Sequence, residues 1–385
     1  MKSKAEAVII GGGVHGCSIA YHLAKKGWKD IVLLEKGTLA CGATGRSVAG
    51  IRHQFGTEIN VRLAKESVKR MENLEEELDY NSSIELLQNG YLMLAYSEEE
   101  LDLFRCNRDL QRNIDPHNMT EILAPEQAAD LVPGLNLEGL FGASFNRRDG
   151  HASPFHVTQA YADAATRLGV DIHTGVEVAK VKKEKDRVTG IITTTGQEIN
   201  APIVIGAAGA FTKKFGEQVG LDIPVVPERH QVAVTEPLEM ILGIMVISFA
   251  HGTYFKQTPH GSLLLGVGDP EGEVKDFNER SSWQFLYDVV QKTTFHWPAL
   301  REVNIIRQWA GLYDMTPDSQ GIVGRTPVDG FYLDLGWSGH GFQLAPAVGQ
   351  VMAEIISGET PFIDVSCMCL ERFERGELIP EPACV

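Results

Sequence analysis

The chain has 385 residues, and its 51 Asp and Glu outnumber its 35 Lys and Arg to leave a formal net charge of −16. That acidity argues against nucleic acid or an anionic membrane surface as the main partner. The length suits two domains, and hydrophobic and charged fractions of 43% and 22% are ordinary for a globular chain. No stretch reaches the roughly 20 apolar residues of a transmembrane helix, so we expect no membrane span.

The cysteines indicate a cytoplasmic protein that holds no metal. None of the six belongs to a Cys-x-x-Cys pair, and the spacing of Cys367 and Cys369 is too tight for a usual zinc site. No pair of histidines accompanies them. We expect reduced thiols, as in the cytoplasm, at Cys17, Cys41, Cys106, Cys367, Cys369 and Cys384.

The chain begins with a strand, a glycine loop, a helix and a second strand. Residues 7–10 form a short apolar run of the kind found in buried parallel strands, and residues 18–26 have helical spacing before Gly27. Residues 31–34 predict the second strand, which Glu35 ends.

Further along, elements of the same α/β kind alternate with stretches of another character. Helical spacing predicts helices over 58–78 and 154–168, and a third from Pro346, a residue that suits a first helical turn. Short strands are predicted at 188–193, 203–205 and 331–335. Elsewhere, strand signals at 90–95, 231–235 and 263–267 and an aromatic helix over 283–295 indicate a second domain.

We therefore predict an α/β (α+β) protein in which one domain is inserted twice into the other. The first domain, of Rossmann type, comprises residues 1–84, 149–220 and 306–385. The inserted substrate domain comprises residues 85–148 and 221–305.

The glycine loop predicts a dinucleotide site. Gly11-x-Gly13-x-x-Gly16 follows a strand and opens a helix, and Glu35 ends the next strand. Gly11 allows a tight turn, Gly13 lets the backbone approach a diphosphate, and Gly16 lets helix and strand pack closely. The helix N-terminus stabilises the diphosphate charge. Glu35 accepts hydrogen bonds from the ribose and disfavours the 2′-phosphate of NADP.

The nucleotide is NAD or FAD on this evidence alone. An NAD domain continues with regular βα units, whereas residues 41–52 are small and contain Arg46 and Arg52. Such a segment indicates a second contact with a longer cofactor, which favours FAD.

Four motifs together resemble the amine-oxidising flavoproteins related to D-amino acid oxidase. The likeness covers essentially the whole chain and is strongest to the group of monomeric sarcosine oxidase, glycine oxidase, the sarcosine oxidase beta subunit and the catalytic subunit of dye-linked L-proline dehydrogenase. The motifs are residues 11–16 with Glu35, residues 44–52, residues 204–211, and the run from Trp309 to Tyr313 through residues 316–318 to Gly339-His340-Gly341-Phe342. Residues 50–55 and 372–378 look most like the proline dehydrogenase subunit.

This resemblance implies non-covalent FAD in a Rossmann-like domain, with an antiparallel-sheet substrate domain over the flavin. The N-terminus of the helix after Gly339 is expected near the flavin pyrimidine ring, where it favours the negative charge of the reduced flavin. The implied cofactor residues are Gly11, Gly13, Val14, His15, Gly16, Glu35, Lys36, Thr44, Arg46, Ser47, Val178, Ala208, Gly209, Gly339, His340, Gly341, Phe342 and Gln343.

The resemblance also implies three catalytic residues: Arg52, Tyr313 and His340. Arg52 falls where the sarcosine oxidase pattern has an arginine that binds the substrate carboxylate, which a guanidinium does bidentately. Tyr313 matches a substrate-site tyrosine, and His340 adjoins the flavin loop. The alternatives are a structural arginine, a core tyrosine and a hydrogen-bonded buried histidine. His53 and His251 are weaker candidates for helpers.

Three positions depart from the family pattern. Gln343 replaces a lysine, which removes a second cation from the carboxylate site. Gly311 replaces the cysteine that carries covalent flavin, so no thioether forms there. Leu264 aligns with a lysine that lies over the flavin in oxidases and stabilises the charge that oxygen gains. Its absence favours a dehydrogenase.

The resemblance thus implies an FAD-dependent amino acid dehydrogenase or oxidase. The expected substrate is a small or secondary amino acid of the proline, hydroxyproline, sarcosine or glycine type. Hydride passes from its α-carbon to flavin N5 and leaves an imine, which hydrolyses. The electron acceptor is expected to be a partner subunit, a quinone or a dye. A 2-hydroxy-acid dehydrogenase and a flavin-carrying electron-transfer subunit of a complex remain open.

Overall fold

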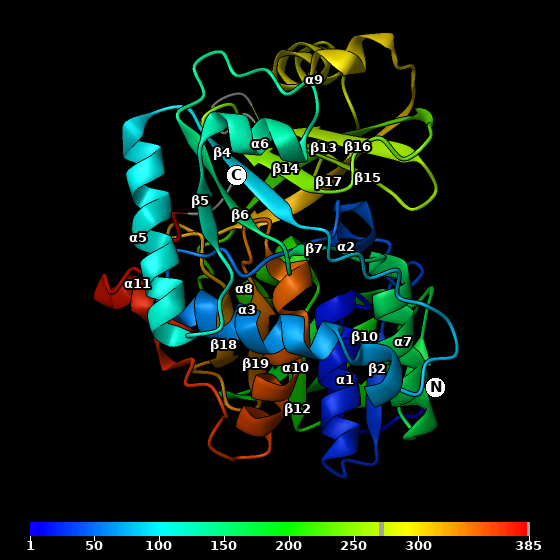
Figure 1. Cartoon of the computed structure of the whole chain (residues 1–385). Helices are drawn as coiled ribbons and strands as arrows, with labels where there is room; N and C mark the ends of the chain where they lie inside the picture. Colours follow the sequence, from blue (N-terminus) through cyan, green and yellow to red (C-terminus); the bar gives the residue numbers. More distant parts are fainter. Residues whose placement is uncertain (269–272, 383–385) are drawn as a thin grey trace.

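The computed structural model describes residues 1–268 and 273–382, so Cys384 lies outside the described residues. The chain forms two layers built on separate sheets, the larger sheet above and the smaller one below in Figure 1. The five cysteines in the described ranges form no disulfide. Within those ranges, no helix combines the length and apolar character needed to cross a bilayer.

The lower layer is a six-stranded sheet in the order β18-β19-β12-β1-β2-β8. All neighbouring pairs are parallel except β18 with β19. The strands are apolar because both faces of the sheet are covered. They are β1 (Ala7–Ile10), β2 (Ile31–Leu34), β8 (Asp171–His173), β12 (Ile203–Gly206), β18 (Ile322–Arg325) and β19 (Phe331–Leu335).

Helices and a small sheet cover the two faces of this layer. One face packs against α1 (Val14–Lys25), α3 (Glu58–Met71), α7 (Pro154–Arg167) and α10 (Gly341–Ile356), which bury a common apolar core. The other face packs against α8 (Thr212–Val219) and the antiparallel strands β9 (Val178–Glu184), β10 (Arg187–Thr193) and β11 (Glu198–Asn200).

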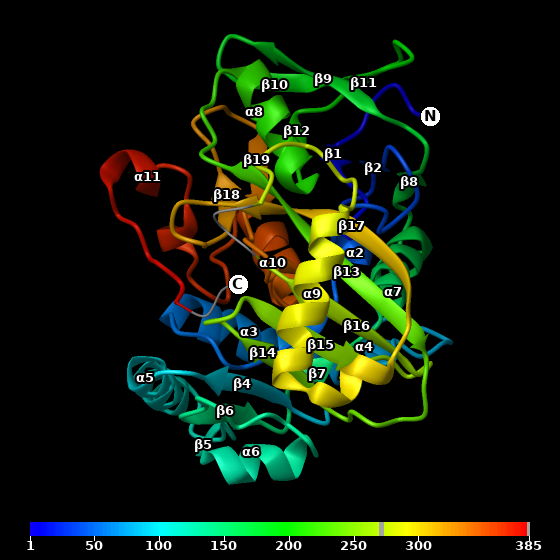
Figure 2. The same cartoon turned by 90° about the horizontal axis from the view of Figure 1, so that it is seen from above.

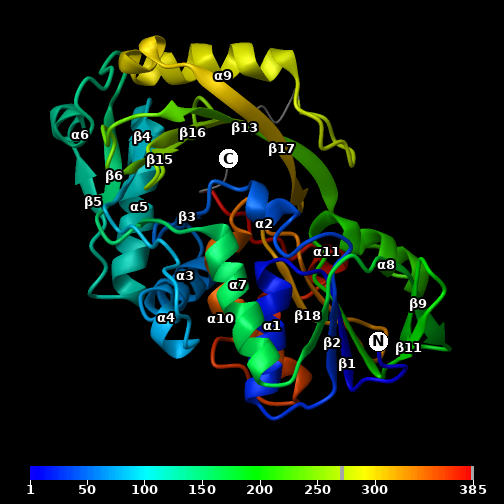
Figure 3. The same cartoon turned by 90° about the vertical axis from the view of Figure 1, so that its right-hand side faces the viewer.

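The upper layer is an eight-stranded sheet in the order β17-β13-β16-β15-β14-β4-β6-β5. Every pair is antiparallel except β14 with β4. Helix α9 (Trp283–His296) lies across its outer face (Figures 2 and 3). The strands are β4 (Tyr91–Ala95), β5 (Glu121–Leu123), β6 (Gly142–Asn146), β13 (Val226–Pro237), β14 (Met245–Ser248), β15 (Thr253–Gln257), β16 (Ser262–Val267) and β17 (Ile305–Met315).

The two faces of the upper sheet bury different side chains, as the alternation of a strand requires. On β4, Leu92 and Leu94 pack in the outer core with Phe285 of α9. Tyr91 and Met93 belong to the opposite face, which is directed toward the lower layer. The sheet thus forms a roof whose inner face reaches the lower domain.

The remaining elements are short, apart from one helix of 17 residues. Two strands, β3 and β7, pair with each other and join the layers next to the site described below. These elements are α2 (Ala43–Arg46), β3 (Gly50–Ile51), α4 (Leu74–Glu77), α5 (Glu98–Ile114), α6 (Pro125–Leu131), β7 (Gly150–His151) and α11 (Arg372–Arg375), with short 3-10 turns at Gly209–Phe211, Pro298–Glu302 and Ser366–Met368.

The predicted mixed α/β fold is confirmed, with several boundaries shifted. The helix expected over 58–78 breaks after Met71 and resumes as α4. Helix α10 starts at Gly341, so Pro346 lies inside the helix rather than in its first turn. The domain boundary expected at 305/306 falls at the start of β17, which pairs with β13 and carries the upper sheet on to Met315.

Candidate cofactor cleft and substrate cavity

The glycine loop lies where β1 ends and α1 begins. Gly11 has φ +116°, and a side chain there would collide with the carbonyl oxygen of Ala207, which follows β12. A side chain at Gly16 would collide with the carbonyl oxygen of Gly11. The loop therefore has to be glycine to bring the N-terminus of α1 to the carboxyl edge of the parallel sheet, where nucleotides bind in such folds.

Glu35 ends β2 beside this loop and is tied to it. One carboxylate oxygen accepts the Gly12 N–H at 2.8 Å, and the other accepts the Gly37 N–H at 2.8 Å. The thiol of Cys41 also donates to Glu35, at 3.3 Å. Glu35 thus orders the loop, and the oxygen lone pairs that remain suit a ribose hydroxyl.

A cleft of about 470 Å³ runs along the carboxyl edge of the sheet and joins all four motif segments. Glycines, helix N-termini and small side chains form the parts of its wall that the glycine loop and residues 41–47 supply, and aromatic and apolar side chains form others. This form fits an extended dinucleotide such as FAD. Of the residues predicted to bind the cofactor, it is lined by Gly11, Gly13, Val14, His15, Glu35, Lys36, Thr44, Arg46, Ser47, Val178, Ala208, Gly209, Gly339, Gly341 and Phe342.

Three predicted cofactor residues lie elsewhere. Gly16 is buried behind the loop against Gly11. His340 and Gln343 line the neighbouring cavity described below. The sequence did not single out several cleft residues that lie far along the chain, because only folding brings them to this edge: Lys214, Gln218, Glu279, Asp314, Asp334 and Trp337.

His15 connects the two helices that open onto the cleft. Its Nδ1 lies 2.9 Å from Asp334 Oδ2, and its Nε2 lies 2.9 Å from the carbonyl oxygen of Gly341. Both partners only accept hydrogen bonds when Asp334 is ionised, so both bonds form only when the imidazole carries two protons. Burial alone would lower the pKa of His15, but the charge of Asp334 and these hydrogen bonds raise it overall. His15 also stacks on Trp337.

Arg46 occupies the space beside Gly311. Its guanidinium donates to the carbonyl oxygen of Ala310 at 2.9 Å and pairs with Glu279 at 3.0 Å. A Cβ atom on Gly311 would lie 3.0 Å from Cβ of Arg46. The side chain of Arg46 thus packs against Gly311, the position that would need a cysteine to carry covalent flavin.

A second, smaller cavity of about 70 Å³ adjoins the cleft. Ser47, Tyr313, Gly339 and Phe342 line both spaces. All three predicted catalytic residues line the cavity, although they come from the segment after β3, from β17 and from the loop before α10. Besides Arg52, His340 and the four shared residues, the cavity is lined by Val48, Ala49, Gly50, Tyr91, Met245, Ile247, Tyr254, Ser338 and Gln343.

Arg52 is the cationic side chain of this cavity and is 5% exposed. Its guanidinium carbon lies 4.7 Å from the ring centre of Phe55 and 5.9 Å from those of Tyr91 and Phe249. Its backbone N–H donates to Oε1 of Gln343 at 2.7 Å. A buried guanidinium among aromatic rings is well suited to hold a carboxylate, because little water competes for it.

Three ionisable side chains in the cavity wall, those of Tyr91, Tyr254 and His340, are neutral near pH 7. Burial raises the pKa of Tyr91 to about 12 and places that of Tyr254 well above its ordinary value. Burial and the charge of Arg52 lower the pKa of His340 to about 3. These groups can donate or accept hydrogen bonds, but none titrates near neutral pH as a general base would.

The ring of Tyr313 is held in place by a stacked histidine. His230 stacks on its ring with the centroids 3.7 Å apart and the planes inclined by 15°. Nε2 of His230 in turn lies 3.0 Å from Oε1 of Glu228. His53 and His251 do not line the cavity: His53 pairs with Asp149, and His251 lies beside Ser248 and Tyr96.

The roof residues Tyr91, Met245, Ile247 and Tyr254 were not predicted from the sequence. They come from β4, β14 and β15, whose inner faces lie over the cavity. Strand alternation could have shown that Tyr91 and Met93 share a face, but not that this face lies over the cofactor cleft.

Replacing His15 with Gln tests its charged state. Because the pKa of His15 is raised in the folded protein, its stabilising effect is complete below its unfolded pKa of roughly 6.5 and is lost as pH rises through the folded value. Wild type should exceed His15→Gln in unfolding free energy by about 1 kcal/mol or more at pH 6, and by less at pH 9. Urea unfolding at both pH values measures this. A difference independent of pH would contradict it.

Comparisons with known proteins identify the family of the chain. Residues 6–355 match the DAO family, described as FAD dependent oxidoreductase. The sarcosine oxidase subunit beta of Rhodobacter capsulatus is 30% identical over 99% of this chain and 91% of its own length. Mitochondrial dimethylglycine dehydrogenase of Rattus norvegicus is 31% identical over 94% of this chain and 44% of its own length. The crystal structure of L-proline dehydrogenase from P. horikoshii has a TM-score of 0.91 at 36% identity, covering 98% of this chain and 100% of that one.

The family match spans most of the chain and includes every residue that lines the cleft. FAD is therefore the cofactor for which the cleft is built. The chain belongs to the DAO family of FAD-dependent oxidoreductases.

Proposed function

We propose that the protein oxidises a small or secondary amino acid of the proline, hydroxyproline, sarcosine or glycine type. FAD held in the cleft would supply the two-electron oxidation of the substrate by accepting the hydride of its α-carbon, and the product would be an imine. The observation that carries the proposal is Arg52, a buried cation in the wall of a cavity that shares Tyr313, Ser47 and Phe342 with the cofactor cleft.

The walls of the cavity select for such a substrate. Arg52 provides a fork for one carboxylate. The opposite walls are apolar or aromatic, with Met245, Ile247 and Tyr254 from the roof. Its volume of about 70 Å³ favours a compact molecule over one with a long side chain. Sarcosine, dimethylglycine and proline, which appear in the names of the relatives, all carry alkyl groups on the amine nitrogen.

The titration states favour an amine over a 2-hydroxy acid. An alcohol needs a base for its hydroxyl proton while the hydride leaves, and Tyr91, Tyr254 and His340 do not titrate near neutral pH. An amine can instead enter the apolar cavity neutral, having given its proton to water. No Asp or Glu is among the described lining residues, so no carboxylate there pairs with an ammonium group.

The acceptor that reoxidises FAD is proposed to be a partner subunit, a quinone or a dye rather than oxygen. One relative is named as a subunit, which supports a partner protein. Leu264 lies on β16 directly opposite Lys256 of β15, and Tyr254 is two residues from Lys256 on the same face. Position 264 is therefore directed toward the lower layer, but Leu264 brings no charge there.

Arg52→Ala tests the carboxylate anchor. Removing a charge-assisted bidentate contact costs on the order of 2–4 kcal/mol, so kcat/KM for the best amino acid in a proline, sarcosine and glycine panel should fall roughly 30- to 1,000-fold. Flavin content, read from visible absorbance, should be unchanged because Arg52 does not line the cleft. An unchanged kcat/KM would remove Arg52 from the substrate site.

Acid precipitation of the purified yellow protein tests how FAD is held. With Gly311 at the cysteine position and Arg46 packed beside it, no thioether can form there. All colour should remain in the supernatant, where chromatography should identify FAD. Colour retained in the protein pellet would show a covalent link.

Stopped-flow reoxidation of substrate-reduced protein in air-saturated buffer tests the acceptor. The flavin should reoxidise more slowly than turnover with a dye, and Leu264→Lys should accelerate it about tenfold or more by placing a cation on the cofactor side of the roof. Burial lowers the pKa of the neighbouring Lys256 to about 7. The substitution should therefore also be made with Lys256→Met, so that two adjacent amines do not suppress each other's charge. Wild-type reoxidation as fast as dye turnover would reject the dehydrogenase assignment.

A further inference from the structure

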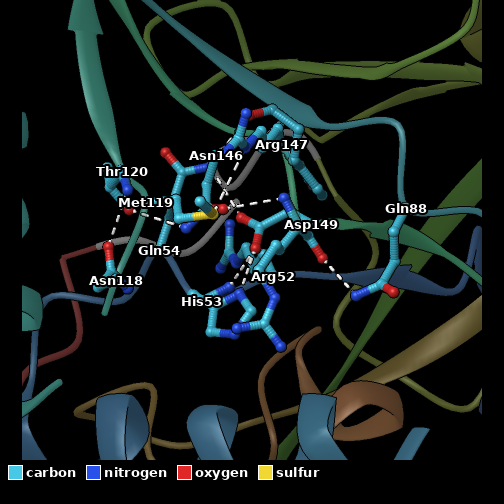
Figure 4. A network of polar contacts seen from close by, with 12 residues as sticks. Arg52, His53, Gln54, Gln88, Asn118, Met119, Thr120, Asn146, Arg147 and Asp149 are labelled. Carbon is cyan, nitrogen blue, oxygen red and sulfur yellow. Dashed lines mark hydrogen bonds and ion pairs between the residues drawn. The ribbon is translucent and has the colours of Figure 1, made fainter. Parts of the chain in front are cut away.

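A buried polar cluster lies directly behind Arg52, on the side away from the cofactor cleft. Its centre is Asp149, which is 0% exposed and lies in the turn between β6 and β7. Figure 4 shows this carboxylate next to His53 and Gln54, the two residues that follow Arg52. Asp149 does not line the cavity, so it does not touch a substrate there.

The carboxylate of Asp149 holds the chain immediately after Arg52. Its Oδ1 accepts the backbone N–H of His53 at 2.8 Å and lies 2.6 Å from Nδ1 of the same residue. Its Oδ2 accepts Nε2–H of Gln54 at 2.9 Å. An ionised carboxylate only accepts hydrogen bonds, so Nδ1 of His53 carries a proton. These charge-assisted bonds are stronger than bonds between neutral groups.

Gln54 connects Asp149 to the upper sheet that covers the cavity. Its Nε2 also donates to the carbonyl oxygen of Tyr91 at 3.0 Å, and its Oε1 accepts the hydroxyl of Ser144 at 2.6 Å. Tyr91 lines the cavity beside Arg52. The segment bearing Arg52 and the strand bearing Tyr91 are thus tied to one another through Gln54 and Asp149.

Arg52 is therefore fixed from two sides. On the cofactor side, its own N–H donates to Gln343 of α10. On the far side, the next two residues are bound to Asp149. A flexible arginine loses binding energy to conformational entropy, whereas one held on a rigid backbone keeps its fork aligned with a carboxylate.

We propose that Asp149 is a positioning residue that sets the place of Arg52 and Tyr91 in the substrate cavity. This inference rests on the proposed function, since it assigns Arg52 the substrate carboxylate. Asp149 acts through His53 and Gln54, and His53 serves as its partner rather than as a proton acceptor in the reaction.

Asp149→Asn isolates this role because it keeps the shape of the side chain. One oxygen becomes an NH₂ group, which must face the N–H donors of either His53 or Gln54. Gln54 cannot turn its amide to compensate, because its oxygen accepts from Ser144 and its nitrogen donates to Tyr91. Donor would face donor in a buried site, and the segment after Arg52 would shift.

The matched control is Thr120→Val in the same cluster. Thr120 is 1% exposed, donates to Gln111 at 2.7 Å and accepts from Asn146 at 3.1 Å. Its hydroxyl contacts lie with Gln111 and Asn146 rather than with residues 52–54, and Figure 4 shows Thr120 on the other side of the cluster from Asp149. The substitution therefore removes buried hydrogen bonds without releasing Arg52.

The measurement is binding of pyrrole-2-carboxylate to the FAD-loaded protein, followed by the change in visible flavin absorbance. This planar carboxylate has no hydrogen on its α-carbon, so it binds without being oxidised. Asp149→Asn should weaken its binding about tenfold or more, and Thr120→Val less than about threefold. Arg52→Ala should weaken it at least as much as Asp149→Asn. Dissociation of FAD, measured by ultrafiltration, should be the same in all four proteins.

A pair of His53 variants provides a second measurement should Asp149→Asn fail to fold. In His53→Asn the side-chain amide can still donate to Asp149, whereas in His53→Leu it cannot. Binding of pyrrole-2-carboxylate should be close to wild type in the first and about tenfold weaker in the second. Equal binding by the two variants would overturn the positioning role.

The outcomes separate this inference from the function on which it rests. If Arg52→Ala weakens binding but Asp149→Asn does not, the positioning role is wrong and the carboxylate anchor stands. If Asp149→Asn and Thr120→Val weaken it equally, the effect is general loosening and the positioning role is again wrong. If wild type does not bind the probe, or Arg52→Ala binds it as wild type does, the anchor itself fails and the inference falls with it.

Discussion

The buried guanidinium of Arg52 is the constraint on which the arrangement of the small cavity depends. Burying the charge of Arg52 is costly unless its surroundings compensate. The rings of Phe55, Tyr91 and Phe249 offer their faces to it. The same charge and burial keep His340 neutral. The cavity is thus positive and largely apolar, which suits a carboxylate joined to a small neutral amine.

The two-layer architecture explains how the cavity comes to adjoin the cleft. Parallel strands deliver their loops to one edge, where the glycine loop, Glu35 and the start of α10 form the cleft. The inner face of the upper sheet closes over that edge, and Tyr313 on β17 lines both spaces. His15 joins the two helices that open there, through Asp334 and Gly341. A substrate in the cavity would therefore lie against a cofactor in the cleft.

The three departures from the family pattern each have a local structural counterpart. Gln343, in place of a lysine, accepts the backbone N–H of Arg52. Gly311, in place of a cysteine, lies against the side chain of Arg46. Leu264, in place of a lysine, is paired across the strands with Lys256. The structure thus places one arginine, Arg52, in the wall of the small cavity and packs Arg46 against Gly311.

The local chemistry of the sequence was enough to identify the nucleotide loop, because Gly11, Gly16 and Glu35 act within one strand–helix–strand unit whose spacing is visible in the chain. The resemblance of four motifs added Arg52, Tyr313 and His340, which the fold brings to one cavity. Tyr91, Tyr254 and Asp149 depended on the tertiary structure alone. Alternation shows that neighbouring strand residues face opposite ways, but not which face another domain covers. Asp149 accepts a hydrogen bond from His53, a residue almost a hundred positions earlier in the chain. Only the pairing of β3 with β7 brings these two residues within hydrogen-bonding distance.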